Sequence, residues 1–224
     1  MPSGVDALGR GCGLNMAQFF SIHPANPQPR LIKQAAEMLR QGAVIVYPTD
    51  SGYAIGCHLD DKEAVTRIRQ IRGLDEKHLM TLMCRDLSEL AKYARVDNAQ
   101  FRLLKNNTPG SYTFILDATK EVPRRLQHPK RSTVGLRIPD HPIALALLAE
   151  LGEPLLSSTL ILPEADEPLT DVDEIREHLE SLVELIIEGG AVGVEPTTVI
   201  DLTDATPVLV RRGKGEVTHL GIEE

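Results

Sequence analysis

The stretch from Val44 to Gly56 constrains the fold of this chain most strongly. Its first half, Val44 to Tyr47, is short, apolar and largely β-branched, which is typical of a buried strand. Its second half, Pro48 to Gly56, is small and polar, with two glycines and several hydroxyl groups. A core strand that ends in such a loop holds polar groups at the rim of a sheet, where open α/β sheets usually bind ligands. An ordinary strand-to-loop turn would give the same pattern.

Composition and charge favour one soluble α/β domain. A chain of 224 residues is long enough to bury about 70% of the surface that its unfolded form exposes. There are 24 Lys and Arg against 32 Asp and Glu, and the net charge of −8 argues against broad coating of nucleic acid. A local basic cleft remains compatible with this charge. Aromatic residues make up only 4% of the chain, so stacking platforms for single-stranded nucleic acid are scarce.

Cysteine and histidine usage indicates a reducing compartment and no dedicated metal site. Cys12, Cys57 and Cys84 are an odd number without metal-type spacing, so we expect a cytoplasmic protein. The sequence has no apolar run long enough to span a bilayer and no signal segment, so we expect no membrane partner. The seven histidines are scattered, which predicts no histidine-built metal site.

The order of periodic segments predicts a single domain with one twisted, mixed sheet and helices packed on it. Helices are expected from Leu31 to just before Gly42, from Asp60 or Asp61 through Ile71, from Asp86, over residues 98–105 and 142–151, and from about Val172. Strands are expected over residues 44–47, 80–84, 111–116, 133–138, 154–158 and 182–187, followed by a hairpin of residues 197–202 and 207–211. Residues 1–15 lack a pattern and are expected to be a disordered or non-native extension, which leaves residues 16–224 as the domain.

Polar side chains cluster where several of these predicted strands end. The clusters are Thr49-Asp50-Ser51, residues 109–113, Arg137, Ser157-Ser158-Thr159, Thr197-Thr198 and Arg211. If the sheet brings them together, they form a cleft of hydroxyl groups with two arginines, which can grip phosphate or carboxylate oxygens. Since no nucleophile–histidine pair stands out, such a cleft would work by positioning and charge stabilisation. Arg137 paired with a structural carboxylate is an equally good interpretation of that residue.

These motifs resemble the YrdC/YciO family, and most closely its YciO branch. The similar segments are residues 47–57, Pro109-Gly110-Ser111-Tyr112-Thr113, Gly135-Leu136-Arg137-Ile138-Pro139, Thr197-Thr198-Val199-Ile200-Asp201 and Arg211. The resemblance runs from about Ser21 to about Gly215. It implies a single α/β domain whose twisted mixed sheet carries flanking helices and a concave, partly basic cleft.

The resemblance also implies ligands. In the threonylcarbamoyl-AMP synthase branch, the family binds ATP, L-threonine and bicarbonate, with Mg²⁺, and makes an adenylate used to modify adenosine 37 of certain tRNAs. The expected binding residues here are Thr49, Ser51, Tyr53, Arg72, Thr113, Arg137, Ser157, Thr159, Thr198 and Arg211. We expect ATP or AMP as the ligand, with Mg²⁺ arriving on the nucleotide, and the resemblance assigns no catalytic residue.

Several positions depart from the synthase pattern. Within the opening motif, Ser51 and Ala54 replace a threonine and a glycine. The synthase Lys-x-Arg reads Arg72-Gly73-Leu74, and its Ser-x-Asn reads Thr159-Leu160-Ile161. Losing one charged phosphate contact weakens binding by about 1.5–3 kcal/mol, and losing several that act together could remove most activity. These replacements are typical of the YciO branch.

Two functions therefore compete. The first is an enzyme acting on threonylcarbamoyl-AMP or a related acyl-adenylate, by weak synthesis or by hydrolysis to AMP, and linked to tRNA threonylcarbamoyladenosine modification. The alternative is a double-stranded RNA- or tRNA-binding protein without catalysis. Its basic set would be Arg67, Arg69, Arg72, Arg124, Arg125, Lys130, Arg131 and Lys214. Scattered, solvated cations would explain the same residues equally well, and the sequence predicts no oligomeric state.

Overall fold

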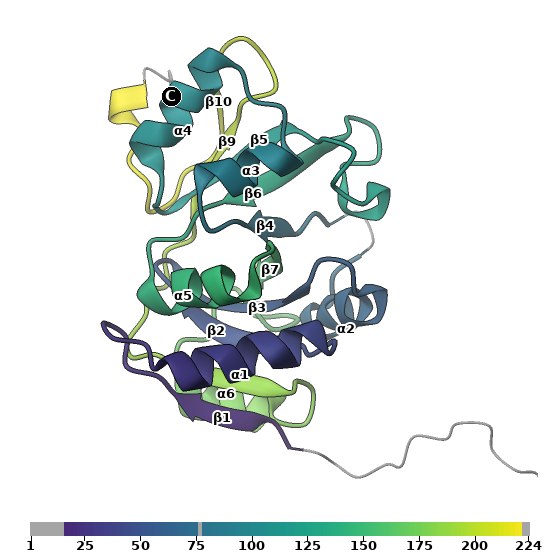
Figure 1. The fold of residues 1–224 in the computed structure, drawn as a ribbon, viewed down its shortest axis with the longest axis vertical. Coiled ribbons are helices and arrows are strands. Elements are labelled where there is room, and N and C mark those ends of the chain that lie inside the picture. The colour runs from purple at the N-terminus through teal and green to yellow at the C-terminus, as the bar shows by residue number, and fades with distance from the viewer. Residues whose placement is uncertain (1–15, 76–77, 221–224) are drawn as a thin grey trace, which may run out of the picture.

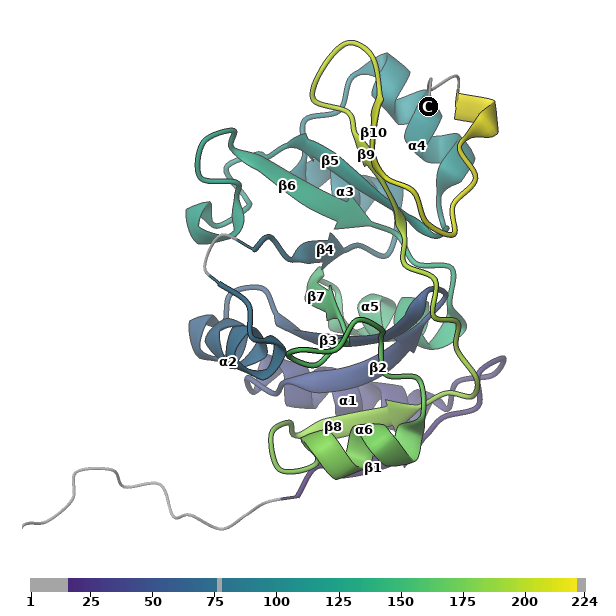
Figure 2. The ribbon, with the colours of Figure 1, turned by 180° about the vertical axis from the view of Figure 1, so that it is seen from behind.

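The structure is a computed structural model that describes residues 16–75 and 78–220. The predicted extension, residues 1–15, lies outside the described residues. The described residues form one ten-stranded open sheet with the strand order β1-β8-β2-β3-β7-β4-β6-β5-β9-β10. The sheet runs the full length of the molecule (Figure 1 and, from behind, Figure 2). The predicted single-domain α/β fold is therefore confirmed.

The strands pair in both senses, so the sheet is mixed, as predicted. In chain order they are β1 (Gln18–Ser21), β2 (Ile45–Thr49), β3 (Gly52–His58), β4 (Thr81–Met83), β5 (Tyr112–Asp117), β6 (Thr133–Arg137), β7 (Leu155–Thr159), β8 (Leu185–Glu188), β9 (Thr198–Asp201) and β10 (Val208–Arg211). The β1–β8, β2–β8, β4–β6 and β5–β9 pairs are parallel. The β2–β3, β3–β7, β4–β7, β5–β6 and β9–β10 pairs are antiparallel, and the last is the predicted hairpin.

The helices begin and end at local signals in the sequence. They are α1 (Pro29–Arg40), α2 (Lys62–Arg72), α3 (Leu87–Tyr93), α4 (Asn98–Asn107), α5 (Pro142–Leu151) and α6 (Val172–Leu179). The Asp61 side chain accepts from the amide of Ala64 and caps α2, and Gly73 ends that helix in the left-handed region. No helix in residues 16–75 and 78–220 is long and apolar enough to cross a membrane.

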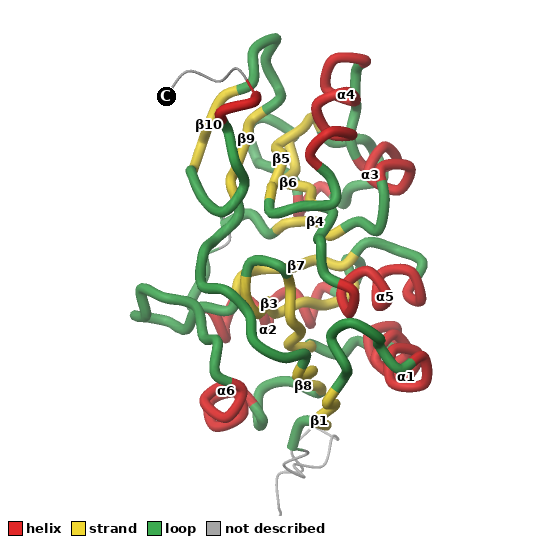
Figure 3. The backbone as a smooth tube through the Cα atoms, turned by 90° about the vertical axis from the view of Figure 1, so that its left-hand side faces the viewer, coloured by secondary structure: helices red, strands yellow, loops and turns green. Residues whose placement is uncertain are grey.

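Two apolar cores fix how the helices cover the sheet. Ile45 and Tyr47 of β2 belong to the core that includes the buried residues of α1 and α5. Val46, which alternates with them, belongs to the core that includes the buried residues of α2 and α6. Figure 3 shows α1 and α5 on one side of the lower strands and α6 on the other. In the upper half of the sheet, Phe114 and Leu136 belong to the same core as the buried leucines of α3 and α4.

Two local predictions were wrong, and one strand was missed. The predicted loop after Thr49 is instead a tight turn into β3, and the first strand, β1, was not predicted at all. The final apolar segment begins pairing only at Leu185, because the amides of Leu182 and Val183 still bond to the carbonyl of Leu179 at the end of α6. The helix that begins after Asp86 was predicted correctly: the Asp86 side chain accepts from the amide of Glu89, and the Glu89 carboxylate accepts from the amide of Arg85.

The glycines of β3 explain why it resembled a loop. Gly56 lies inside the sheet, where an added Cβ would stand 3.0 Å from the carbonyl oxygen of Leu156 and 3.0 Å from a ring carbon of Tyr47. Glycine is required there for close packing of the neighbouring strand and ring, rather than for chain flexibility.

We therefore expect Gly56→Ala to lower the free energy of unfolding by about 1–3 kcal/mol through overpacking. Gly135→Ala is the matched control, because an added Cβ in β6 would meet its nearest neighbour, Thr113, at 3.5 Å. Urea denaturation of both variants measures the difference. Equal stabilities of the two variants would contradict this account of Gly56.

Candidate functional site

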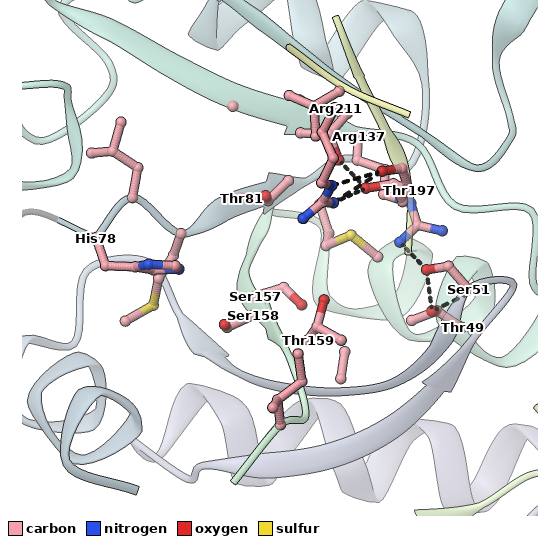
Figure 4. A pocket seen from close by; sticks show the side chains of 18 of the residues that line it. Thr49, Ser51, His78, Thr81, Arg137, Ser157, Ser158, Thr159, Thr197 and Arg211 are labelled. Atoms are coloured by element: carbon pink, nitrogen blue, oxygen red, sulfur yellow. Dashed lines mark hydrogen bonds between the residues drawn. The ribbon is translucent and has the colours of Figure 1, made fainter. Parts of the chain in front are cut away.

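A cavity of about 360 Å³ lies where the turn after β2 faces the middle and upper strands of the sheet. Alternate residues of the central strands line it: Thr81 and Met83 from β4, Thr113 and Ile115 from β5, and Gly135 and Arg137 from β6. The intervening residues point into the apolar core on the opposite face. Figure 4 shows hydroxyl groups and guanidinium groups converging on the cavity from several strands.

The structure brings together nine of the ten predicted binding residues. The lining includes Thr49, Ser51, Tyr53, Arg72, Thr113, Arg137, Ser157, Thr159 and Arg211. These residues come from both halves of the sheet and from the last turn of α2. Their convergence supports one ligand site, and their contacts with a ligand stay a prediction.

Thr198 is the exception and requires a correction. It is fully buried, its hydroxyl donates to the carbonyl of Gly215 at 2.6 Å, and the amide of Gly213 donates to it at 3.0 Å. It therefore anchors the segment after β10 rather than facing the cavity. Its neighbour Thr197 lines the cavity instead, with its hydroxyl 2.9 Å from that of Thr113. The alternation of side chains at the start of β9 separates the two threonines.

Arg137 forms a buried ion pair with Asp50 at one wall of the cavity. Its side chain is 7% exposed, and its terminal nitrogens donate to the Asp50 carboxylate at 2.5 Å and to the Ser51 hydroxyl at 2.8 Å. The Nε of Arg137 has no partner among the described residues. The interpretation of Arg137 as paired with a structural carboxylate is therefore correct, and this residue lines the cavity as well.

Asp50 is held from four directions. Besides Arg137, its carboxylate accepts from the Ser111 hydroxyl at 2.6 Å and from the amide of Asp140 at 3.2 Å, and its carbonyl accepts from the Lys214 ammonium at 2.5 Å. Burial alone would raise the pKa of Asp50, but the Arg137 charge and the hydrogen bonds outweigh it and lower this pKa below its ordinary value. Asp50 therefore stays ionised at neutral pH.

The other two arginines of the lining also bind groups of the chain. Arg72 donates from Nε to the Ser158 hydroxyl at 3.3 Å and from another nitrogen to the carbonyl of Ile161. Arg211 donates to the carbonyl of Thr197 at 2.9 Å. Burial lowers the pKa of both guanidinium groups, yet an arginine keeps its charge at neutral pH. Arg72 is thus half-buried in the site and is not one of the scattered, solvated cations that the sequence also allowed.

The lining carries positive charge and no carboxylate of its own, and Asp50 beside it partly balances the charge of Arg137. Among the described residues, it contains three arginines, one histidine and many hydroxyl groups, but no Asp or Glu. Such a set suits a ligand with phosphate or carboxylate oxygens.

Four polar lining residues were missing from the predicted binding set. They are His78, Thr81, Ser158 and Thr197. Ser158 and Thr197 belong to the strand-end clusters that the sequence shows, so the signal for them was present. His78 lies in an irregular segment before β4, and no pattern in the sequence marks it. Burial, together with the charges of Arg72 and Arg69, lowers the pKa of His78, while Asp75 opposes this change.

Several cations of the predicted RNA-binding set have partners within the chain. Arg67 bonds to Glu184 at 2.8 Å, Arg125 donates to the carbonyl of Leu59, and Arg131 lies 3.5 Å from Asp201. These cations would therefore have to give up contacts within the chain before they could bind RNA phosphates. RNA binding stays a prediction.

Comparison with known proteins identifies similar chains. The Sua5/YciO/YrdC family model, described as telomere recombination, matches residues 37–213. The protein YciO of Escherichia coli is 62% identical over 202 residues, which is 90% of this chain and 98% of that protein. The crystal structure of that protein superposes with a TM-score of 0.88 at 61% identity, covering 92% of this chain and all of the other.

Some more distant relatives are named for an enzymatic activity. The threonylcarbamoyl-AMP synthase of Halorhodospira halophila is 31% identical over 180 residues, which is 80% of this chain and 93% of the synthase. Sua5 of Pyrococcus abyssi, crystallised with L-threonine, superposes with a TM-score of 0.81 at 28% identity. That comparison covers 88% of this chain and 58% of the Sua5 chain.

The Asp50–Arg137 pair yields a stability prediction. We expect Asp50→Asn to lower the free energy of unfolding by about 3 kcal/mol at neutral pH, because it leaves the buried Arg137 charge without a partner. Since the folded-state pKa of Asp50 is lowered, its contribution is present above the unfolded-state pKa and is lost as the pH falls through the folded-state pKa. The gap between wild type and variant should therefore shrink in acid, as measured by urea denaturation at several pH values.

Glu37→Gln provides the control for this experiment. Glu37 pairs with Arg40 at 3.4 Å with both side chains exposed, so its loss should cost less than about 1 kcal/mol. A difference between wild type and Asp50→Asn that stays constant down to strongly acid pH would contradict the assigned pair.

Proposed function

Because the chain belongs to the Sua5/YciO/YrdC family, we propose that its cavity binds an acyl-adenylate of the threonylcarbamoyl-AMP type and hydrolyses it to AMP. Relatives at about 30% identity are named threonylcarbamoyl-AMP synthases, and one Sua5 structure holds L-threonine. Such an activity would lower the supply of the adenylate that is used in tRNA threonylcarbamoyladenosine modification.

The charge distribution of the cavity supports this ligand class. Threonylcarbamoyl-AMP carries one phosphate charge and one carboxylate charge at separate places. Figure 4 places Arg137 and Arg211 on one side of the cavity and His78 on the other, with Ser157, Ser158 and Thr159 between them. Arginines can hold the anionic groups, and the hydroxyl groups can position the remaining oxygens.

One observation favours hydrolysis over synthesis. The Arg72 guanidinium, at the place of the synthase Lys-x-Arg, is held by Ser158 and by the carbonyl of Ile161. Ile161 itself lines the cavity at the place of the synthase asparagine. ATP and departing pyrophosphate carry more charge than an adenylate and need more donors. A cavity with fewer free donors therefore suits the adenylate better than the triphosphate.

The kinds of oxygen atom in the lining also determine how Mg²⁺ could be bound. Carboxylate and water oxygens are the usual ligands of this ion in proteins, and the described lining has no carboxylate. Mg²⁺ would thus be held mainly by phosphate oxygens of a bound nucleotide, and the hydroxyl groups of the lining would be its protein contacts.

The test uses two parallel reactions. In one, purified protein receives ATP, Mg²⁺, L-threonine and bicarbonate, and in the other it receives preformed threonylcarbamoyl-AMP. We expect AMP from the preformed adenylate and no threonine-dependent pyrophosphate in the first reaction. Pyrophosphate release that requires threonine would show a working synthase instead. If neither AMP nor pyrophosphate forms, the result would favour the RNA-binding alternative, which a duplex-RNA gel shift across a salt series can test.

Arg211 provides a variant for this assay. We expect Arg211→Gln to lower kcat/KM for AMP release by about 10–100-fold, because a charged donor near the ligand is lost. Arg212→Gln changes the net charge equally, and Arg212 does not line the cavity, so it should stay within about threefold of wild type. Equal effects of the two substitutions would contradict the assigned site.

Restoring the synthase residues at the replaced positions tests whether the chain can gain synthesis activity. We expect the triple variant Arg72→Lys, Leu74→Arg and Ile161→Asn to raise threonine-dependent pyrophosphate release at least about tenfold, since one restored phosphate contact contributes about 1.5–3 kcal/mol. Ile161→Asn alone serves as the control for a change in cavity polarity without added charge. An unchanged pyrophosphate rate, with AMP binding intact by calorimetry, would contradict this explanation of the preference for hydrolysis.

A further inference from the structure

The cavity lining contains few groups that can exchange a proton near neutral pH. The arginines stay charged, and burial raises the pKa of Tyr53, so its phenol stays neutral. Asp50 lies at the wall, but its carboxylate already accepts from Arg137, Ser111 and the amide of Asp140. Among the described lining residues, His78 is therefore the one side chain whose ordinary pKa is close to neutrality.

The backbone holds His78 at the entrance of the cavity. Its amide donates to the carboxylate of Asp75 at 2.9 Å and to the carbonyl of Asp75 at 3.2 Å. Figure 4 shows its ring nitrogens directed toward the cavity, on the side of Ser157 and Ser158. The residue is exposed although it lines the cavity, so a proton on its ring has a path to solvent.

The charges around His78 favour its neutral form. Partial desolvation of the imidazole against the cavity lowers its pKa, and the guanidinium groups of Arg72 and Arg69 on α2 lower it further. The carboxylate of Asp75 acts in the opposite direction but does not reverse the change. At neutral pH the ring is therefore a proton acceptor beside a cationic ligand site.

We propose that His78 is the general base of the hydrolysis, accepting a proton from the water that attacks the acyl carbon of the bound adenylate. The inference rests on the proposed function. The water oxygen bonds to the carbonyl carbon, and its proton moves to a ring nitrogen of His78. The bond from that carbon to the phosphate oxygen breaks, and AMP leaves with the electron pair. The imidazolium ion then releases its proton to solvent, which restores the neutral ring.

The experiment measures AMP release from preformed threonylcarbamoyl-AMP as a function of pH. Wild-type kcat should fall as the pH drops through the pKa of His78, below the ordinary value of 6.5, because protonation removes the acceptor. His78→Asn should lower kcat by about 10²–10⁴-fold and remove this acid dependence. Its affinity for AMP, measured by calorimetry, should stay within about threefold of wild type.

His141→Asn is the matched control. Burial also lowers the pKa of His141, and Asp50 and Arg137 lie near it, but it does not line the cavity. This variant should keep the wild-type acid dependence. Because His78 lies at the cavity entrance, added imidazole should partly restore AMP release in His78→Ala, which a merely structural role would not allow.

The possible outcomes separate the two proposals. An active wild type in which His78→Asn keeps its rate and acid dependence would overturn the role of His78 and leave the hydrolytic function standing. A His78→Asn variant that changes only KM would assign His78 to ligand binding and overturn proton transfer. A wild type that releases no AMP would overturn the proposed function and this inference with it.

Discussion

The buried pair of Asp50 and Arg137 is the interaction on which the rest of the site depends. Asp50 lies in the turn between β2 and β3, and Arg137 ends β6, so the pair joins the two halves of the sheet at one wall of the cavity. Ser111 and the amide of Asp140 complete the coordination of the carboxylate. A buried charge is costly unless it is paired and hydrogen-bonded, and here both conditions are met. The wall of the cavity is thereby fixed before any ligand arrives.

This pairing determines what Arg137 can offer a ligand. Two of its donors already hold Asp50 and Ser51, which leaves Nε without a partner among the described residues. A ligand carboxylate therefore meets an oriented guanidinium whose charge is partly balanced, rather than a free cation. Arg72 and Arg211 then contribute most of the unbalanced positive charge of the lining. A preorganised site of this kind favours selection by geometry over binding of any anion.

The sequence predicted the parts of the site that depend on local patterns. A buried strand followed by hydroxyl groups led to Thr49 and Ser51, and the polar clusters at the ends of predicted strands included Arg137. It failed where long-range packing decides the outcome. Gly56 resembled a loop residue, because only the neighbouring strand shows that a side chain would not fit. Thr198 was chosen over Thr197, since a one-residue shift at the start of β9 exchanges the two faces. His78 follows no periodic pattern, and only the fold places it at the cavity.

The contrast between the net charge of −8 and the cationic cavity argues for a small anionic ligand. Since the three arginines of the lining are cationic, the excess negative charge lies elsewhere in the chain, where it repels extended polyanions. Duplex RNA needs many phosphate contacts along a continuous basic surface. Arg67 and Arg131 already pair with acidic residues of the chain, so recruiting them for RNA would break existing ion pairs. The proposed adenylate would meet the three arginines of the lining, which already converge on one cavity.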